Sequence, residues 1–174
     1  VTTPGDNDWY GVRMLPGSTG HKLAHLNIEH ATTPLYIDVD EPMTIEHITS
    51  TKARTGTAGY VHLTLLGEGP YMVINNRFKG GIYTMAIGAA YGQPTQAKAI
   101  VANLQNNIFY DYYNHGVLVD TNHQSAQLHV EHNTFFSDYY PSTFASDHMW
   151  IRRGAVDQGA TIKNNIFASN QQYQ

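Results

Sequence analysis

The seven residues VEHNTFF at Val130–Phe136 contain a short motif that returns along most of the chain. The motif consists of an apolar residue, a polar residue, His or Asn, then Asn, a variable residue and Phe. The other copies are IKNNIF at 162–167, LQNNIF at 104–109, VINNRF at 73–78, and the weaker IEHITS at 45–50 and IEHATT at 28–33. A motif that recurs every few tens of residues is typical of a solenoid, in which successive copies stack on one another.

Each copy predicts two short strands joined by a tight corner. The apolar residues recur with a period close to two and favour Ile and Val, which indicates β-strand. Asparagine tolerates the left-handed backbone region and bonds to its own backbone, so it suits a one-residue corner. We therefore predict corners at Asn76, Asn107, Asn133 and Asn165. Stacked corners would let these side chains bond to one another along a ladder.

A further strand is predicted between successive copies of the motif. The segments are LYIDV (35–39), YVHLTLL (60–66), IYTMAIG (82–88), GVLVD (116–120) and HMWIR (148–152). No stretch has a convincing apolar period of 3.6, so few helices are expected. A β-sandwich also contains many short strands, but it does not repeat one hexapeptide with asparagine at a fixed place. The sequence therefore predicts an all-β fold, a parallel β-helix of about six coils forming a single domain over residues 1–174.

Composition excludes several classes of partner. The chain has 174 residues, no cysteine and a formal net charge of −4. An acidic balance gives no reason to expect nucleic acid, which needs a basic surface, and no apolar run is long enough for a membrane span. The chain begins at Val1, and the segment IKNNIFASN at 162–170 is followed at once by QQYQ with no amphipathic cap. Because uncapped solenoid ends are pairing hazards, we expect a segment of a longer protein, or end-to-end or domain contacts at the uncapped coils.

The repeats resemble the short NNxF coils of the right-handed parallel β-helix superfamily, the pectate-lyase-like fold. The opening DWYGVRMLPGSTGHKLAHLNIEHA at 8–31 is also similar to a coil of bacterial surface β-helix proteins, with W-x-G-[IV]-R before a Gly-Ser turn. The resemblance implies a right-handed coil, a secreted or cell-surface location and a polysaccharide or glycan as partner. The fold carries lyases, hydrolases and inert adhesins alike, so it does not by itself fix an activity.

Strand alternation predicts an outer face along the middle strands. If the large apolar residues point inward, the outer face is formed by Tyr36, Asp38, His62, Thr64, Thr84, Ala86, Leu118, Asp120, Trp150 and Arg152. In the enzymes that the chain resembles, the corresponding sheet forms the polysaccharide cleft. We predict Asp120 as the acid or base, Arg152 as the stabiliser of charge, and His62 or His148 as assisting groups. The alternative is a solvated sheet face with an Asp120–Arg152 salt bridge.

Two aromatic segments add a candidate surface for sugar stacking. FYDYYNHG at 109–116 and FFSDYYPSTFASDHMW at 135–150 occupy the same loop of successive coils. Aromatic rings present an apolar face with a polar tip, which suits a sugar ring. The predicted substrate-binding residues are Trp150, Tyr112, Tyr113, Tyr139, Tyr140 and Asp38. The alternative is that these loops pack on the wall of the coil.

The ten histidines and one acidic turn raise the question of a metal. His30, His47 and His132 share one motif position with asparagines, which favours side chains that bond along a corner ladder. No helical H-x-x-x-H pair and no cysteine support zinc, so no metal site is predicted. DVDE at 38–41 offers the hard oxygen ligands that calcium prefers, and the alternative is an exposed acidic turn.

Two functions follow from these observations. The first is a carbohydrate-binding or carbohydrate-active β-helix, a polysaccharide lyase or glycoside hydrolase if it is an enzyme, that uses the middle-strand face and the Tyr-rich loops. The second is a non-catalytic structural or adhesive module of a surface protein. A pair of carboxyl groups beside the aromatic rings would favour the first, and a flat face without a cleft the second.

Overall fold

The computed structural model describes residues 9–20, 22–53, 61–88, 98–121, 126–137, 147–152 and 159–169. These residues form eighteen short strands in three sheets of six strands each. Sheet 1 contains β1 (Val12–Met14), β4 (Leu35–Ile37), β7 (Val61–Leu65), β10 (Tyr83–Ile87), β13 (His115–Asp120) and β16 (Asp147–Arg152). Sheet 2 contains β2 (Lys22–Ala24), β5 (Met43–Glu46), β8 (Tyr71–Ile74), β11 (Val101–Gln105), β14 (Gln127–Glu131) and β17 (Ala160–Lys163). Sheet 3 contains β3 (Asn27–Glu29), β6 (Thr49–Ala53), β9 (Arg77–Gly80), β12 (Ile108–Tyr110), β15 (Thr134–Ser137) and β18 (Ile166–Ser169).

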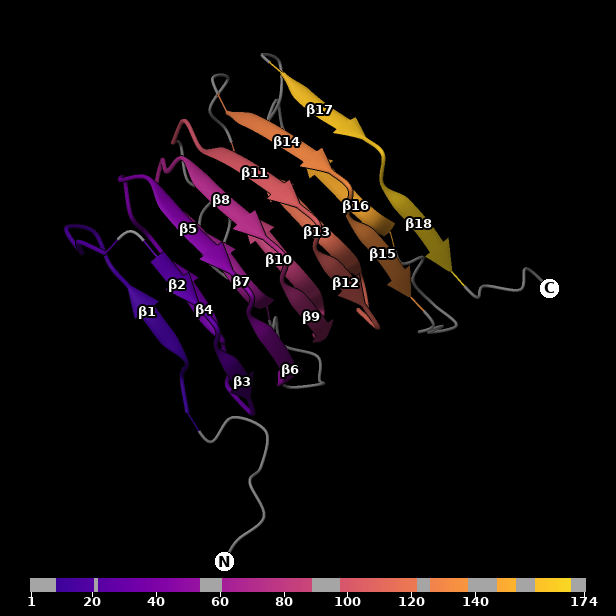
Figure 1. Cartoon of the computed structure of the whole chain (residues 1–174), viewed down its shortest axis with the longest axis horizontal. Helices are drawn as coiled ribbons and strands as arrows, with labels where there is room; N and C mark the ends of the chain where they lie inside the picture. The colour runs from indigo at the N-terminus through magenta and orange to yellow at the C-terminus, as the bar shows by residue number, and fades with distance from the viewer. Residues whose placement is uncertain are drawn as a thin grey trace, which may run out of the picture.

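The chain visits the three sheets in turn, and every pair of neighbouring strands is parallel. Three consecutive strands, one from each sheet, form what we call a rung, and successive rungs stack side by side along the molecule (Figure 1). The described residues contain no helix, and hence none long and apolar enough to cross a membrane. The predicted fold class, an all-β parallel β-helix, is confirmed.

The core lies between the three sheets and is formed by rows of equivalent residues. One row consists of Leu23, Ile45, Val73, Leu104, Val130 and Ile162, which are paired in register along sheet 2. Another consists of Ile28, Ser50, Phe78, Phe109, Phe135 and Phe167 along sheet 3. The phenylalanine rings of this second row are stacked, with centroids 5.8 Å apart for Phe78–Phe109 and 4.9 Å for the next two pairs.

The left-handed corner lies one residue earlier than the sequence predicted. Positive φ angles occur at the residues that directly follow the sheet 2 strands, namely His25, His47, Asn75, Asn106, His132 and Asn164. The predicted corner residues Asn76, Asn107 and Asn133 follow these positions and are buried. The prediction placed both functions, the bend and the ladder, on one asparagine. In the structure, two successive residues share these functions. The left-handed residue makes the bend with its side chain toward solvent, and the asparagine after it points inward and forms the ladder.

The inward asparagines form a continuous ladder between Asn76 and Asn165. The Nδ2 group of each residue donates to Oδ1 of the next, over 3.0 Å from Asn76 to Asn107, 2.9 Å from Asn107 to Asn133 and 3.1 Å from Asn133 to Asn165. The backbone NH of each also donates to the same Oδ1. The ladder thereby satisfies backbone groups that the corner removes from the sheets. The predicted ladder is confirmed for these four residues.

The first copy of the motif also differs from the prediction. Leu23 pairs in register with Ile45, so the first copy is LAHLNI at 23–28 rather than IEHATT at 28–33. Ile28 lies in sheet 3, in the row of the phenylalanines. His25 therefore takes the corner position assigned to His30, and its ring stacks on His47 with centroids 5.0 Å apart. His30 lies at a later left-handed position, after β3, like Asp111 after β12.

Candidate functional site

The outer face of sheet 1 has one continuous row of residues across all six strands. Arg13, Tyr36, Thr64, Ala86, Leu118 and Trp150 are paired in register. The residues on either side of Tyr36, Leu35 and Ile37, belong to the core, so strand alternation turns this row away from the core. Thr64, Ala86 and Leu118 in the middle of the row are nevertheless buried, so they do not form the exposed face that the sequence predicted. Trp150 is 40 % exposed. The predicted outward orientation of Trp150 agrees with this register.

An unbroken run of rings crosses the last three strands of this face. The Tyr83 ring stacks on His115 with centroids 5.3 Å apart, and the His115 ring lies 4.5 Å from the ring of Trp150. Tyr83, His115 and Trp150 come from β10, β13 and β16. His115 is buried between its two neighbours, whereas Trp150 leaves much of its indole open to solvent. The run therefore ends in an accessible aromatic face.

A carboxylate lies beside the run of rings. Asp147 pairs in register with His115, and its Oδ2 atom lies 3.7 Å from His115 Nδ1. The Asp147 side chain is mostly exposed. An exposed carboxylate next to an aromatic ring can accept hydrogen bonds from the hydroxyl groups of a ligand stacked on that ring.

Asp120 and Arg152 lie at the other end of the same two strands. They are paired in register, as the sequence predicted. Asp120 is largely buried, and the side chain of Arg152 falls outside the described residues. The predicted ion pair and the roles of both residues stay predictions.

The prediction that His62 lies on the outer face is wrong. His62 is completely buried, and its Nδ1 atom shares a 2.8 Å hydrogen bond with Oγ of Ser50, in the row of the core phenylalanines. Its ring lies 6.1 Å from that of Phe78. Burial lowers the pKa of His62 to about 4, against the opposing effect of the Gly80 and Lys79 carbonyls. His62 is a neutral core residue at neutral pH.

The cause of this inversion is a break in the alternation near the start of the sheet 1 strands. Thr84 and Gly116 occupy the same place in their strands as His62, one residue before the core row of Leu63, Met85 and Val117. A Cβ built on Gly116 would lie 2.9 Å from Phe135 Cδ1, so this position faces the phenylalanine stack. Thr84 is buried, and its hydroxyl donates to the Gly116 carbonyl. The predicted outward orientation of Thr84 is therefore also wrong.

His148 occupies the same place in the last strand. Its ring lies 5.6 Å from that of Phe167, and its Nδ1 atom is hydrogen-bonded to the hydroxyl of Tyr112. Burial lowers the pKa of His148, opposed by the charge of Asp147. Tyr112 is completely buried, and burial raises the pKa of its hydroxyl. The predicted place of Tyr112 on an exposed stacking surface is wrong, because its ring belongs to the hydrophobic core.

The other predicted tyrosines are placed only in part. Tyr113 is half-buried, and its backbone NH donates to the Gly81 carbonyl over 2.9 Å. Tyr139 and Tyr140 lie outside the described residues. Of the predicted stacking residues, Trp150 is exposed on this face, and the place of Tyr113 beside it stays a prediction.

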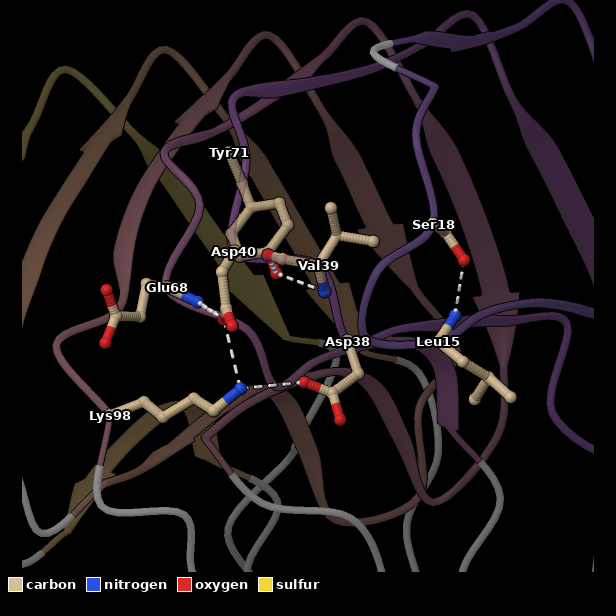
Figure 2. Close-up of polar contacts among 8 residues, drawn as sticks. All are labelled: Leu15, Ser18, Asp38, Val39, Asp40, Glu68, Tyr71 and Lys98. Carbon is tan, nitrogen blue, oxygen red and sulfur yellow. Dashed lines mark hydrogen bonds and ion pairs between the residues drawn. The ribbon is translucent and has the colours of Figure 1, made fainter.

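The acidic turn around Asp38 binds a lysine. The Lys98 Nζ atom lies 3.1 Å from Asp38 Oδ1 and 3.0 Å from Asp40 Oδ1, between the two carboxylates (Figure 2). The backbone NH of Glu68 donates to Asp40, and this bond, followed by that of Lys98, lowers the pKa of Asp40. Burial opposes ionisation of Lys98, but the two carboxylates outweigh it and raise the pKa of Lys98. The turn joins three successive rungs, and Asp38 lies in it rather than beside Trp150.

The same turn was the candidate for calcium. In this structure an ammonium group takes the place between the carboxylates that a cation would need. The described residues contain no group of three or more His, Asp or Glu side chains able to hold a metal ion. Calcium stays a prediction.

Sequence reasoning missed Tyr83 and His115 as parts of this surface. Both stand two residues before a core residue, Met85 or Val117, and simple alternation would have turned them inward. The signal available was Gly116, because a glycine inside a strand often marks a bulge or a close approach of another group.

No protein-family model, no curated protein and no solved structure matches this chain.

Proposed function

We propose that this chain binds carbohydrate on the outer face of sheet 1, around Trp150. The observation that carries the proposal is the run of Tyr83, His115 and Trp150, which spans three adjacent strands and ends in an exposed indole. Aromatic faces offer the large apolar contact that a sugar ring can stack on. The buried His115 ring packs against the indole, with the two rings tilted by 58°. This contact would hold Trp150 in place before a ligand arrives and so lower the entropic cost of binding.

Polar groups flank the stacking surface on the same strands. Asp147 lies at one end of β16, and the aligned pair of Asp120 and Arg152 lies near the other. A glycan matches such a surface, since its rings can stack on the indole and the exposed Asp147 carboxylate can accept from its hydroxyl groups.

The geometry supports binding more than cleavage. Of the residues predicted to assist catalysis, His62 is a core residue and His148 is turned toward Tyr112 and Phe167. Glycosidases need two carboxyl groups facing one bond across about 5–10 Å, and Asp120 is largely buried. We therefore propose a binding module and leave lyase or hydrolase activity as the weaker reading.

The resemblance of the NNxF rungs to polysaccharide-processing β-helix proteins agrees with this proposal. A secreted or cell-surface location is part of it, since polysaccharides are met there.

The test is glycan-array screening followed by calorimetric titration of the glycans that bind. Trp150→Ala should weaken binding about tenfold, or about 1.4 kcal/mol, because it removes the stacking face and leaves the core rows in place. Phe136→Ala is the matched control, since Phe136 is 37 % exposed but lies in sheet 3. Absence of binding to any glycan, or an equal loss in both variants, would contradict the proposal.

An adhesive module is the second candidate, and the outer face of sheet 3 favours it. Ile108, Phe136 and Ile166 are exposed there on neighbouring strands. Exposed apolar residues that lie together on one face indicate contact with another protein. Protein binding that is lost in Phe136→Ala and kept in Trp150→Ala would support this function instead.

A further inference from the structure

The last rung, β16–β17–β18, leaves its core residues open on one side. Phe167 is 46 % exposed and Ile162 44 % exposed, whereas Phe135 and Val130, the preceding residues of the same rows, are completely buried. Each of the three strands is the outermost strand of its sheet among the described residues. The rows that build the core therefore stop at a surface with unused stacking and pairing capacity.

The asparagine ladder indicates which chemical group a partner of this surface would need to supply. The backbone NH groups of Asn76, Asn107 and Asn133 each donate to an Oδ1 atom supplied by the following rung. Ile48 is the equivalent residue in the rung before Asn76. Its backbone NH likewise donates to an oxygen of the following rung, Asn76 Oδ1, over 2.9 Å. Within the described part of the chain, no following rung supplies such an oxygen to Asn165.

The phenylalanine stack gives a second requirement, which is an aromatic ring from the partner. Phe167 stacks on the ring of Phe135 at 4.9 Å and lies 5.6 Å from the ring of His148 in its own rung, and among the described residues no ring of a following rung contacts it. An aromatic ring on the open side would continue the offset stack, and an aliphatic side chain would fill it less completely.

A second copy of this chain, docked through its first rung, would not supply these two groups. Its row members are Leu26 in the place of the ladder asparagine and Ile28 in the place of the phenylalanine. Leu26 has no side-chain oxygen for the Asn165 NH, and a buried donor left without an acceptor is destabilising. One favourable contact would form, because Arg13 would lie beside Trp150 as it now lies over Tyr36 at 4.4 Å. It does not replace the missing acceptor.

We propose that the last rung is a docking surface for a further parallel β-solenoid rung that carries asparagine in the ladder row and an aromatic residue in the phenylalanine row. The sequence predicted end-to-end contacts without specifying the partner. The proposal specifies a rung with asparagine and an aromatic residue at these two positions, and a head-to-tail polymer of this chain does not provide such a rung.

The experiment extends the whole chain by one of its own rungs. Ser169 pairs in register with Ser137, the position equivalent to Asp111, so residues 112–137 can be fused directly after Ser169. The control fusion is identical except for Asn133→Leu and Phe135→Ile in the appended copy, which reproduces the first rung's row members. Amide hydrogen exchange of β17 and β18 is measured in both fusions and in the unmodified chain.

The fusion with the natural rung should slow exchange in β17 and β18 by about tenfold or more, because edge amides become part of an internal ladder. The control fusion should slow it clearly less. Equal protection by the two rungs, or no protection by the natural rung, would overturn the proposal. So would sedimentation of the unmodified chain as a head-to-tail polymer, since in that polymer Leu26 would meet Asn165.

Discussion

At the scale of single residues, the motif assigns two neighbouring asparagines different tasks. In LQNNIF, Asn106 has a positive φ and bends the chain, whereas Asn107 is buried and bonds to both neighbouring rungs. The sequence showed that asparagine was needed at the corner but did not show which of the two bends. Both residues tolerate a left-handed backbone, so only the hydrogen-bond partners separate them.

Asn107→Ala should therefore destabilise the fold by about 1–3 kcal/mol, because it leaves the buried NH of Asn76 without its acceptor. Asn106→Gly is the matched control, since glycine adopts the left-handed conformation without strain, and we expect it to be neutral or slightly stabilising. Urea denaturation of both variants tests this. Equal losses of stability would mean that the ladder contributes no more than the bend.

His62 predicts a specific dependence of stability on pH. Its pKa is about 4 in the folded chain and 6.5 in the reference state, so the unfolded chain binds the proton more readily. The contribution of His62 is fully present above pH 6.5 and is lost progressively as the pH falls toward 4. Between pH 7 and pH 5 the free energy of unfolding should fall by about 2 kcal/mol on this account.

The measurement is urea denaturation at both pH values in the parent chain and in His62→Gln. The variant should show a smaller decrease in stability between pH 7 and pH 5, whatever other groups contribute. The same decrease in both proteins would show that His62 accepts a proton in the fold as easily as outside it.

At the scale of elements, the strands of sheet 1 explain why the candidate site could be predicted only in part. Alternation placed Trp150 on the outer face and aligned Asp120 with Arg152, and both agree with the register. It failed for His62 and Thr84, because β7 and β10 each turn two successive residues inward near their start. A rule with a strict period of two has no place for such a break.

Gly116 is the residue that tests this break. A Cβ at this position would lie 2.6 Å from the His148 carbonyl oxygen and 2.9 Å from Phe135 Cδ1, so Gly116→Ala should destabilise the chain by about 1–3 kcal/mol through overpacking. Thermal unfolding measures the effect. In the double variant with Phe135→Leu the two costs should be less than additive, because the smaller side chain makes room. Strict additivity would show that Gly116 does not pack against Phe135.

At the scale of the whole molecule, the repeat was sufficient to predict the fold class. Four copies with both Asn and Phe define the stacking rows, and the structure pairs Phe78, Phe109, Phe135 and Phe167 in register. The first rung was misaligned because Leu26 and Ile28 replace the two diagnostic residues there, and IEHATT resembled the motif by chance. The run of Tyr83, His115 and Trp150 could not be predicted, since it depends on contacts between rungs that the local pattern does not encode.

The asparagine ladder also has a direction. Every backbone NH in the row from Ile48 to Asn133 donates to an oxygen from the following rung, while the asparagine Nδ2 groups also donate to carbonyls of the preceding rung. During synthesis from the N-terminus, each rung would thus complete its hydrogen bonds only when the next rung emerges and folds against it. The newest rung would always be the least stable, and its arrival would consolidate the one before. Folding of this chain should therefore proceed rung by rung from the N-terminus, in the order in which the chain is made, with each rung becoming stable once the next has folded against it.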